Sequence, residues 1–186
     1  MTKSRESIAF SRIDQWEWRL CQRANRATRY SWIRGYFRVV SRLGDGWLWY
    51  ALILSLPALK GLAGWHLAIT MTLSGIVCTL FYKALKHTLV RERPFISFPS
   101  IQCATAPLDR YSFPSGHSLH AVCFNTLLFA QAPTLALLVL PFTLSVLVSR
   151  VVLGLHYPSD VAAGSLIGLL FAALAWSIMA ATFPIV

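Results

Sequence analysis

The stretch VAAGSLIGLLFAALAWSIMAATFPIV, residues 161–186, contains no charged side chain. A helix of about 20 apolar residues crosses the hydrocarbon core of a bilayer, so this stretch is long enough to span a membrane. The rest of the chain has a similar composition: of its 186 residues, 56% are hydrophobic and only 13% are charged. A soluble domain carries roughly twice that charged fraction. The sequence therefore predicts an all-α integral membrane protein that forms a single domain over residues 1–186.

Five apolar segments predict a bundle of about five transmembrane helices over residues 46–186. These segments lie near residues 47–59, 65–85, 115–131, 134–155 and 160–182. The first is short for a span, and an extension backwards through the turn-like sequence LGDG would lengthen it. A polar loop with four prolines separates the second segment from the third. With five spans, the N-terminal segment, this loop and the connection around His156 all lie on one side of the membrane.

Residues 1–42 form a basic segment that holds ten of the 17 Lys and Arg side chains of the chain. Apolar residues recur in it every three or four positions, at Phe10, Ile13, Trp16, Leu20 and Ala24. This pattern favours an amphipathic helix in the membrane interface, and a solvated basic arm is the alternative. Basic residues beside apolar spans indicate contact with the bilayer surface and not with nucleic acid. No cleavable signal peptide is expected, because the N-terminus lacks an apolar core region.

Two polar clusters lie at the ends of predicted spans. Lys86 ends the second apolar segment and Arg93 follows seven residues later, although basic residues at a helix end also serve as plain membrane anchors. In the sequence PSGH, Ser115 and Gly116 would offer free backbone N–H groups at a helix N-terminus, where the helix dipole favours an anion. His117 stands beside them and can carry a proton. The same tetrapeptide also fits an ordinary turn with a satisfied histidine.

A third cluster comprises Arg150, His156 and Asp160, where the carboxylate can orient the imidazole and leave its other nitrogen as a nucleophile. Together the clusters supply two histidines, one carboxylate, three cations and a helix N-terminus, which suits phosphoryl transfer. One histidine would attack the phosphorus and the other would protonate the leaving oxygen, but the pattern alone does not say which. The sequence has no carboxylate cluster suited to Mg²⁺ and no CxxC pair, so we expect a route without metal or cofactor.

In chain order, the three motifs read KHTLVRERP (86–94), PSGH (114–117) and SRVVLGLHYPSD (149–160). This trio resembles the signature of the type-2 phosphatidic acid phosphatase family, a group of membrane lipid phosphatases related to the vanadium haloperoxidases. The family pattern is K-x6-RP, then PSGH, then SR-x5-H-x3-D, and all three parts match without departure. Each motif alone is weak or moderate, whereas the ordered trio is highly specific.

The resemblance implies a role for each matching residue. His156 would be the nucleophile that forms a phosphohistidine, and Asp160 would orient it. His117 would protonate the leaving group and then activate water for the second step. The residues that would bind the phosphate are Lys86, Arg93, Ser115, Gly116 and Arg150.

Other polar residues near the motifs are expected to have structural or surface roles. His120 would pack against neighbouring helices or line the site, and His87 flanks the site in sequence. Arg91 and Arg110 in the polar loop are expected to contact lipid headgroups. His66 falls on the opposite face and is expected at the membrane interface.

The membrane setting favours a lipid phosphate whose tail stays in the bilayer while the headgroup enters the site. A polyprenyl diphosphate such as undecaprenyl diphosphate is the first choice, with phosphatidylglycerophosphate, phosphatidate and lipid A phosphates as alternatives. The apolar spans argue against a vanadate-dependent peroxidase, because those relatives are soluble. The intact histidines and carboxylate argue against a carrier or scaffold. The pattern makes no prediction of the oligomeric state.

The distribution of basic residues predicts an orientation in the membrane. With five spans, the face of the site carries 16 of the 17 Lys and Arg residues, and the other face carries Lys60 alone. By the positive-inside rule, the site would face the cytoplasm across a bacterial inner membrane. Family members more commonly present this site to the periplasm.

Overall fold

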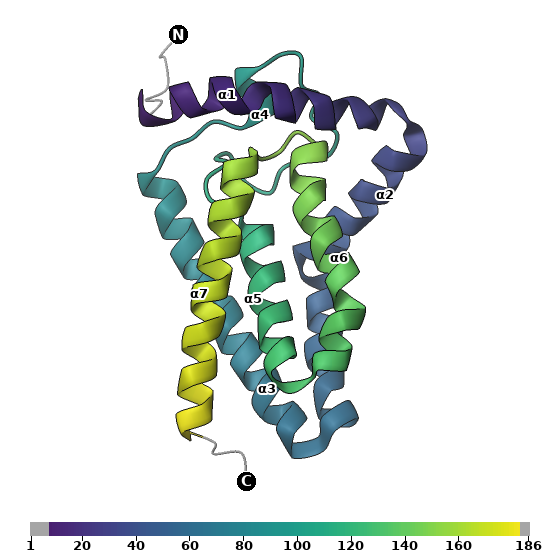
Figure 1. Ribbon diagram of the computed structural model, residues 1–186, viewed down its shortest axis with the longest axis vertical. Helices are drawn as coiled ribbons and strands as arrows, with labels where there is room; N and C mark the ends of the chain where they lie inside the picture. The colour runs from purple at the N-terminus through teal and green to yellow at the C-terminus, as the bar shows by residue number, and fades with distance from the viewer. Residues whose placement is uncertain (1–7, 183–186) are drawn as a thin grey trace.

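Seven α-helices and two short helical turns make up the computed structural model, which describes residues 8–182 (Figure 1). No strand occurs within this range, so the all-α prediction is confirmed for it. Residues 1–7 of the predicted basic segment and residues 183–186 lie outside the described residues, and so does the side chain of Phe10.

The first span is longer than the predicted segment of residues 47–59. Helix α2 (Ser31–Arg42) leads through the turn η2 (Leu43–Trp47) into α3 (Leu48–Thr88), so that LGDG forms a kink at Gly46 and not a loop. This continuous stretch has 58 residues, more than two spans require. Gly61 has a φ of 57°, which glycine adopts without a steric penalty, and the helix reverses there (Figure 1).

The described helices form the five predicted spans. Three stretches are long and apolar enough to cross a membrane, namely residues 31–88, α6 (Pro133–Val152) and α7 (Pro158–Thr182). The reversal within α3 divides the first stretch into two spans. The fifth is α5 (Gly116–Gln131), which has 16 residues and packs against α3, α6 and α7 in the centre of the bundle. The protein is therefore an integral membrane protein with a helical bundle around α5.

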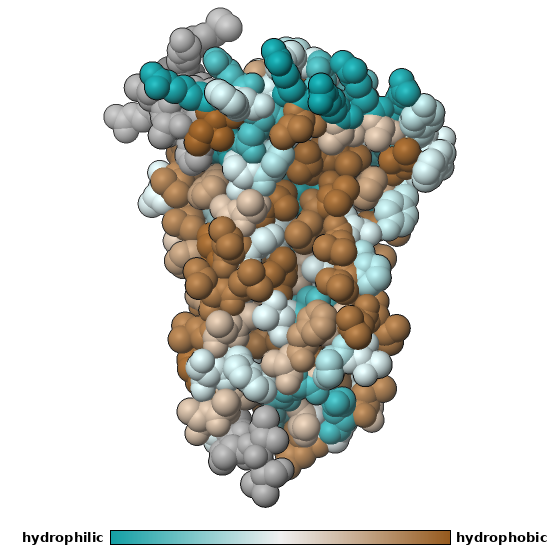
Figure 2. Space-filling view, in the orientation of Figure 1, coloured by the Kyte–Doolittle hydropathy of each residue, from teal (hydrophilic) through white to brown (hydrophobic). Residues whose placement is uncertain are grey.

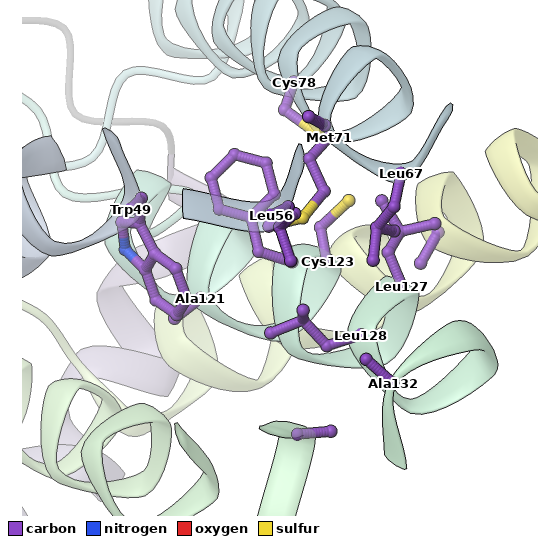
Figure 3. Packing of buried hydrophobic residues seen from close by; sticks show 14 of the residues in the cluster. Trp49, Leu56, Leu67, Met71, Cys78, Ala121, Cys123, Leu127, Leu128 and Ala132 are labelled. Carbon is purple, nitrogen blue, oxygen red and sulfur yellow. The ribbon is translucent and has the colours of Figure 1, made fainter. Parts of the chain in front are cut away.

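The core of the bundle is a single large cluster of buried apolar side chains. Figure 3 shows Leu56 and Met71 of α3 close to Cys123 of α5, and Trp49 of α3 beside Ala121 of α5. Cys78 and Cys123 are both buried and free, as expected of cysteines that act as small hydrophobes.

The outer surface of the bundle is apolar, as lipid contact requires. Large side chains such as Leu54, Leu138 and Leu170 are more than 70% exposed. Figure 2 shows a broad hydrophobic surface on the visible face of the bundle and hydrophilic side chains gathered at the end covered by α1.

Helix α1 (Ile8–Asn25) lies across this end of the bundle (Figure 1). The turn η1 (Arg26–Arg29) joins it to α2, and the loop of residues 89–115, which includes α4 (Pro94–Ser97), lies at the same end. Trp16 of α1 is 86% exposed and Leu20 is 55% exposed, as expected of a helix whose apolar side contacts lipid. Because α1 packs on the bundle, its described residues are not a solvated arm.

Candidate active site

A cavity of about 700 Å³ extends from the 89–115 loop in among the helices of the bundle. Its walls come from α2, η2, α3, α5, α6, the 89–115 loop and the connection that follows α6. Six of the predicted site residues line it: Lys86, Arg93, Gly116, His117, Arg150 and His156. Ser115 and Asp160 do not line the cavity and are fully buried behind it. The three sequence motifs therefore converge at one place, as predicted.

Two of the three cations share a carboxylate that the sequence analysis did not single out. The Lys86 Nζ atom lies 2.8 and 2.7 Å from the two carboxylate oxygens of Asp109. Arg93 Nη2 donates to Asp109 Oδ1 at 2.8 Å. Burial favours the protonated form of Asp109, but the hydrogen bond and charge of Lys86, with those of Arg93, outweigh it and lower the pKa of this carboxyl. Asp109 therefore stays ionised, and its carboxylate binds Lys86 and Arg93, two of the residues expected to bind phosphate.

Arg150, the third cation, is 2% exposed and comes from the last turn of α6. Its Nη1 atom donates to Ser41 Oγ at 3.1 Å, while its Nε atom has no hydrogen-bond partner among the described residues. A buried guanidinium on a cavity wall with an unsatisfied donor is a suitable partner for an anion.

The PSGH motif forms the start of α5, but Ser115 and Gly116 differ in their position relative to the cavity. The backbone N–H of Ser115, expected to be free for an anion, donates to the carbonyl of Asp160 at 3.1 Å. The Ser115 side chain caps α5 by accepting from the N–H of Ser118. Gly116 does line the cavity, and a Cβ there would lie 3.3 Å from the ring of Tyr82. The prediction of a free N–H group is therefore wrong for Ser115, because the neighbouring helix α7 uses that donor.

His156 and Asp160 lie close together without a hydrogen bond. The His156 Nδ1 atom is 3.6 Å from Asp160 Oδ2, beyond hydrogen-bond distance. That oxygen accepts from the backbone N–H of Tyr157 at 2.8 Å. Burial, together with the charges of Arg93 and Arg150, lowers the pKa of His156 well below its ordinary value. The imidazole is therefore neutral near pH 7, as a nucleophile requires.

Arg91 is not at the headgroup surface, so that prediction is wrong. Its side chain is 1% exposed and forms ion pairs with three carboxylates, those of Asp14, Glu17 and Asp160. Burial disfavours its charge, but the charge of Asp160 and the hydrogen bonds of Glu17 and Asp14 outweigh this effect and raise its pKa. Two of the partners, Asp14 and Glu17, lie three residues apart on α1. This spacing on an amphipathic helix was the sequence signal that could have indicated a shared basic partner.

Asp45 is a second residue that sequence reasoning missed. Its Oδ1 atom lies 2.5 Å from Nε2 of His117. The sequence held a signal, because Asp45 is the one Asp or Glu within residues 31–88, and carboxylates in membrane spans are costly. Because the LGDG sequence suggested a turn, Asp45 was not identified as a candidate site residue. His120, by contrast, bonds Thr79 and the carbonyl of Gly116, in agreement with a packing role.

Sequence comparison matches residues 63–184 to the PAP2 superfamily. One relative is the decaprenylphosphoryl-5-phosphoribose phosphatase of Mycolicibacterium smegmatis, 42% identical over 43% of this chain and 42% of that protein. Another is the undecaprenyl-diphosphatase of Sulfolobus acidocaldarius, 29% identical over 73% of this chain and 66% of that protein. The chain thus spans less than two thirds of the length of either relative.

Two solved structures resemble the bundle closely. LpxE of Aquifex aeolicus has a TM-score of 0.72 at 24% identity, over 86% of this chain and 93% of that one, a likeness that shows the fold alone. A transmembrane PAP2-type phosphatidylglycerolphosphate phosphatase of Bacillus subtilis has a TM-score of 0.70 at 26% identity, over 90% of this chain and 86% of that one. Because the family match covers more than half of the sequence and includes all three motifs, this chain belongs to the PAP2 superfamily of type-2 phosphatidic acid phosphatases.

Proposed function

We propose that the protein is a lipid phosphatase that removes a terminal phosphate from a lipid phosphate or diphosphate. The observation that carries this proposal is the convergence of three cations and two histidines on one cavity in a membrane-embedded bundle. Such groups neutralise and orient a phosphoryl group, which is most of what catalysis of its transfer requires. Family membership supports the same activity.

In this proposal, His156 attacks the phosphorus and the bond to the leaving oxygen breaks, which gives a phosphohistidine. His117 supplies the proton that the leaving oxygen takes. A water then attacks the phosphohistidine, His117 takes a proton from it, and inorganic phosphate is released. Asp160 orients the nucleophile from behind. The phosphate is bound by Lys86, Arg93, Arg150 and Gly116, and Ser115 acts through the cap of α5.

No metal enters this mechanism, because the charge of the transferred phosphate is met by protein cations. Lys86, Arg93 and Arg150 all lie on or beside the cavity wall, and each is at least 94% buried. Charges in such surroundings are weakly screened and act strongly on an anion. The proposal predicts that activity persists in EDTA.

The cavity offers an apolar wall for the lipid tail. Ile53, Leu54, Ile76 and Leu80 of α3 line it, and Leu54 and Leu80 are also exposed on the outside of the bundle. A tail could therefore lie against α3 while the phosphate reaches the histidines. We propose a polyprenyl diphosphate such as undecaprenyl diphosphate as the substrate, supported by the relative named undecaprenyl-diphosphatase. Phosphatidylglycerophosphate, phosphatidate and lipid A phosphates are the alternatives.

A phosphate-release panel across these lipids, with purified protein in detergent and EDTA, tests the function. We expect the polyprenyl diphosphate to give the highest kcat/KM. His156→Ala should abolish release and the ³²P-labelled, acid-labile adduct formed by the wild type. His66→Ala makes the same change near the reversal within α3, outside the cavity lining, and should leave both signals intact. Full activity in His156→Ala would contradict the proposed mechanism.

We further propose that the protein lies in the bacterial inner membrane with the cavity facing the cytoplasm. The support is the concentration of basic residues at that end of the bundle. Cys103 provides a native reporter, because it is exposed on the loop at this end while the other three cysteines are buried. A membrane-impermeant maleimide should label Cys103 only after spheroplasts are permeabilised. Labelling in intact spheroplasts would contradict this orientation.

A cysteine added at the C-terminus of a Cys103→Ser variant is the matched control. With five spans it lies on the opposite side, so intact spheroplasts should show its labelling. A label at both positions or at neither would indicate broken cells or an inaccessible terminus.

A further inference from the structure

Asp45 lies in η2, the one π-helical turn within residues 8–182, where the first span passes the cavity. Gly46 in the turn has a φ of 138°, which is not a helical conformation. The widened turn directs the Asp45 carboxylate to the His117 imidazole, with Oδ1 2.5 Å from Nε2.

The glycines on either side of Asp45 make this approach sterically feasible. A Cβ at Gly44 would lie 3.2 Å from Val146 Cγ2 and 3.6 Å from His117 Cδ2. A Cβ at Gly46 would lie 2.7 Å from Tyr50 Cε2. Larger residues would therefore crowd Val146 and Tyr50 and push the turn away, and LGDG is suited to hold a carboxylate at this place.

The free-energy cost of placing the Asp45 carboxylate in an apolar stretch also indicates that this residue has a function. Asp45 is the one acidic residue within residues 31–88, in a stretch apolar enough to cross the membrane. A charged side chain in such a stretch is expensive unless it pairs or lines a cavity, and it usually serves function. Asp45 does both, since its side chain is 29% exposed, lines the cavity and contacts a histidine that is 12% exposed.

We propose that Asp45 is a positioning residue for His117, so that the active site contains a second histidine–carboxylate pair beside His156 and Asp160. The Asp45 carboxylate holds the imidazole in one orientation and one tautomer. This inference rests on the proposed function, because it assigns Asp45 to the proton transfer of that reaction. A buried imidazole without such a partner would rotate or carry its proton on the wrong nitrogen.

The proton balance closes over one turnover. As His156 bonds to phosphorus and the bond to the leaving oxygen breaks, the His117–Asp45 pair gives one proton to that oxygen. When water attacks the phosphorus and the bond to His156 breaks, the pair takes one proton from the water. The pair therefore begins and ends each cycle in the same protonation state.

The dependence of kcat/KM on the leaving group distinguishes the positioning of His117 by Asp45 from a purely structural role. A general acid matters greatly for an alkoxide leaving group and little for p-nitrophenolate. For Asp45→Asn, we expect kcat/KM to fall roughly 100-fold with dodecyl phosphate but less than about fivefold with p-nitrophenyl phosphate. Glu92→Gln, a matched change of carboxylate to amide outside the cavity lining, should leave both values unchanged. Equal losses on the two substrates would overturn the inference.

A double-mutant cycle tests whether Asp45 acts through His117. In a His117→Ala background, Asp45→Asn should lower kcat/KM by less than about twofold further, because the group that it positions is absent. An undiminished effect in that background would overturn the inference. Thermal unfolding in detergent checks that each variant is folded.

A spectroscopic test does not depend on catalysis. In ¹⁵N-histidine NMR spectra of the protein in detergent, Asp45→Asn should shift the Nε2 signal of His117, identified by its loss in His117→Ala, while Glu92→Gln should not. An unchanged signal would overturn the inference even if the wild type proved inactive on every lipid phosphate. Inactivity of the wild type together with a shifted signal would contradict the proposed function alone.

Discussion

The Nδ1 atom of His156 lies 3.6 Å from Oδ2 of Asp160, and the other oxygen of that carboxylate accepts a hydrogen bond from Arg91. Asp160 is therefore held from two sides, since Oδ2 also accepts from the N–H of Tyr157. The sequence analysis assigned the Asp160 carboxylate to His156, but the side chain that holds this carboxylate is Arg91. This arrangement makes the position of Asp160, and through it that of His156, depend on Arg91.

Replacement of Arg91 should impair both stability and activity. Arg91→Met leaves three acidic groups without their cation, and breaking a buried ion pair costs about 3–5 kcal/mol. We expect a clear drop in melting temperature in detergent and a kcat lowered by at least about tenfold, with partial rescue in Arg91→Lys. Arg110→Gln is the control, because Arg110 is exposed on the same loop. Wild-type stability in Arg91→Met would contradict the role of this network.

The lowered pKa of His156 sets the acid side of the pH profile. The ordinary histidine pKa is about 6.5, and burial with the charges of Arg93 and Arg150 moves it well below that value. The neutral, nucleophilic form therefore persists as the pH falls through 6.5, and kcat/KM should decline only at a lower pH. NMR titration of the His156 signals, identified by their loss in His156→Ala, should give the same low midpoint. A midpoint at or above about 6.5 would contradict the structure.

The same shift affects stability, with a sign that follows from proton binding. Between the folded and unfolded pKa values, the unfolded chain binds the proton and the folded protein does not. His156 therefore lowers the free energy of unfolding as the pH falls below about 6.5. In the wild type, thermal unfolding in detergent at pH 7.5 and 5.5 should show this loss, and the loss should be smaller in His156→Ala.

Removal of the Asp109 carboxylate should strengthen the binding of phosphate. Asp109 pairs with Lys86 and Arg93, so an incoming phosphate competes with it for the same donors. For Asp109→Asn, we expect the inhibition constants of inorganic phosphate and vanadate to fall roughly tenfold, which corresponds to about 1.4 kcal/mol. Glu92→Gln removes the same charge outside the cavity lining and serves as the control. A weaker inhibition in Asp109→Asn would indicate that the carboxylate organises the cations instead.

The close approach of α7 to α5 predicts a stability effect at Gly164. A Cβ there would lie 2.5 Å from the carbonyl oxygen of Ser115, at the N-terminus of α5. Gly164→Ala should therefore destabilise the protein by about 1–3 kcal/mol, the usual cost of overpacking. Gly35→Ala in α2 is the matched control, because no atom of the described residues comes within 4 Å of its added Cβ, and it should stabilise the protein by about 0.5–1 kcal/mol. Thermal unfolding in detergent measures both.

The spans and the convergence of the motifs could be predicted because each rests on a local pattern. Apolar length identified the helices, and the motifs at their ends identified the cavity that now contains Lys86, His117 and His156. The alternation of sides along the chain then placed the motifs at one end of the bundle. These signals depend only on residue type and spacing.

The partners of the polar residues could not be predicted, because they depend on contacts between distant segments. Arg91 is 77 residues from Asp14 and 69 from Asp160, and no local pattern links them. Asp45 is 72 residues from His117, and the glycines around it suggested a turn. The N–H of Ser115 looked free because the sequence does not show that α7 supplies an acceptor. Tertiary packing decided each of these cases.

The hydrogen bonds between Glu17 and Ser159 connect positions 142 residues apart. Glu17 lies on α1 and Ser159 lies at the start of α7. The helix that begins beside Ser159 also carries Asp160 and supplies the acceptor for Ser115. A nascent chain in the translocon therefore carries separate pieces of the active site, and the site assembles only when α7 enters the membrane.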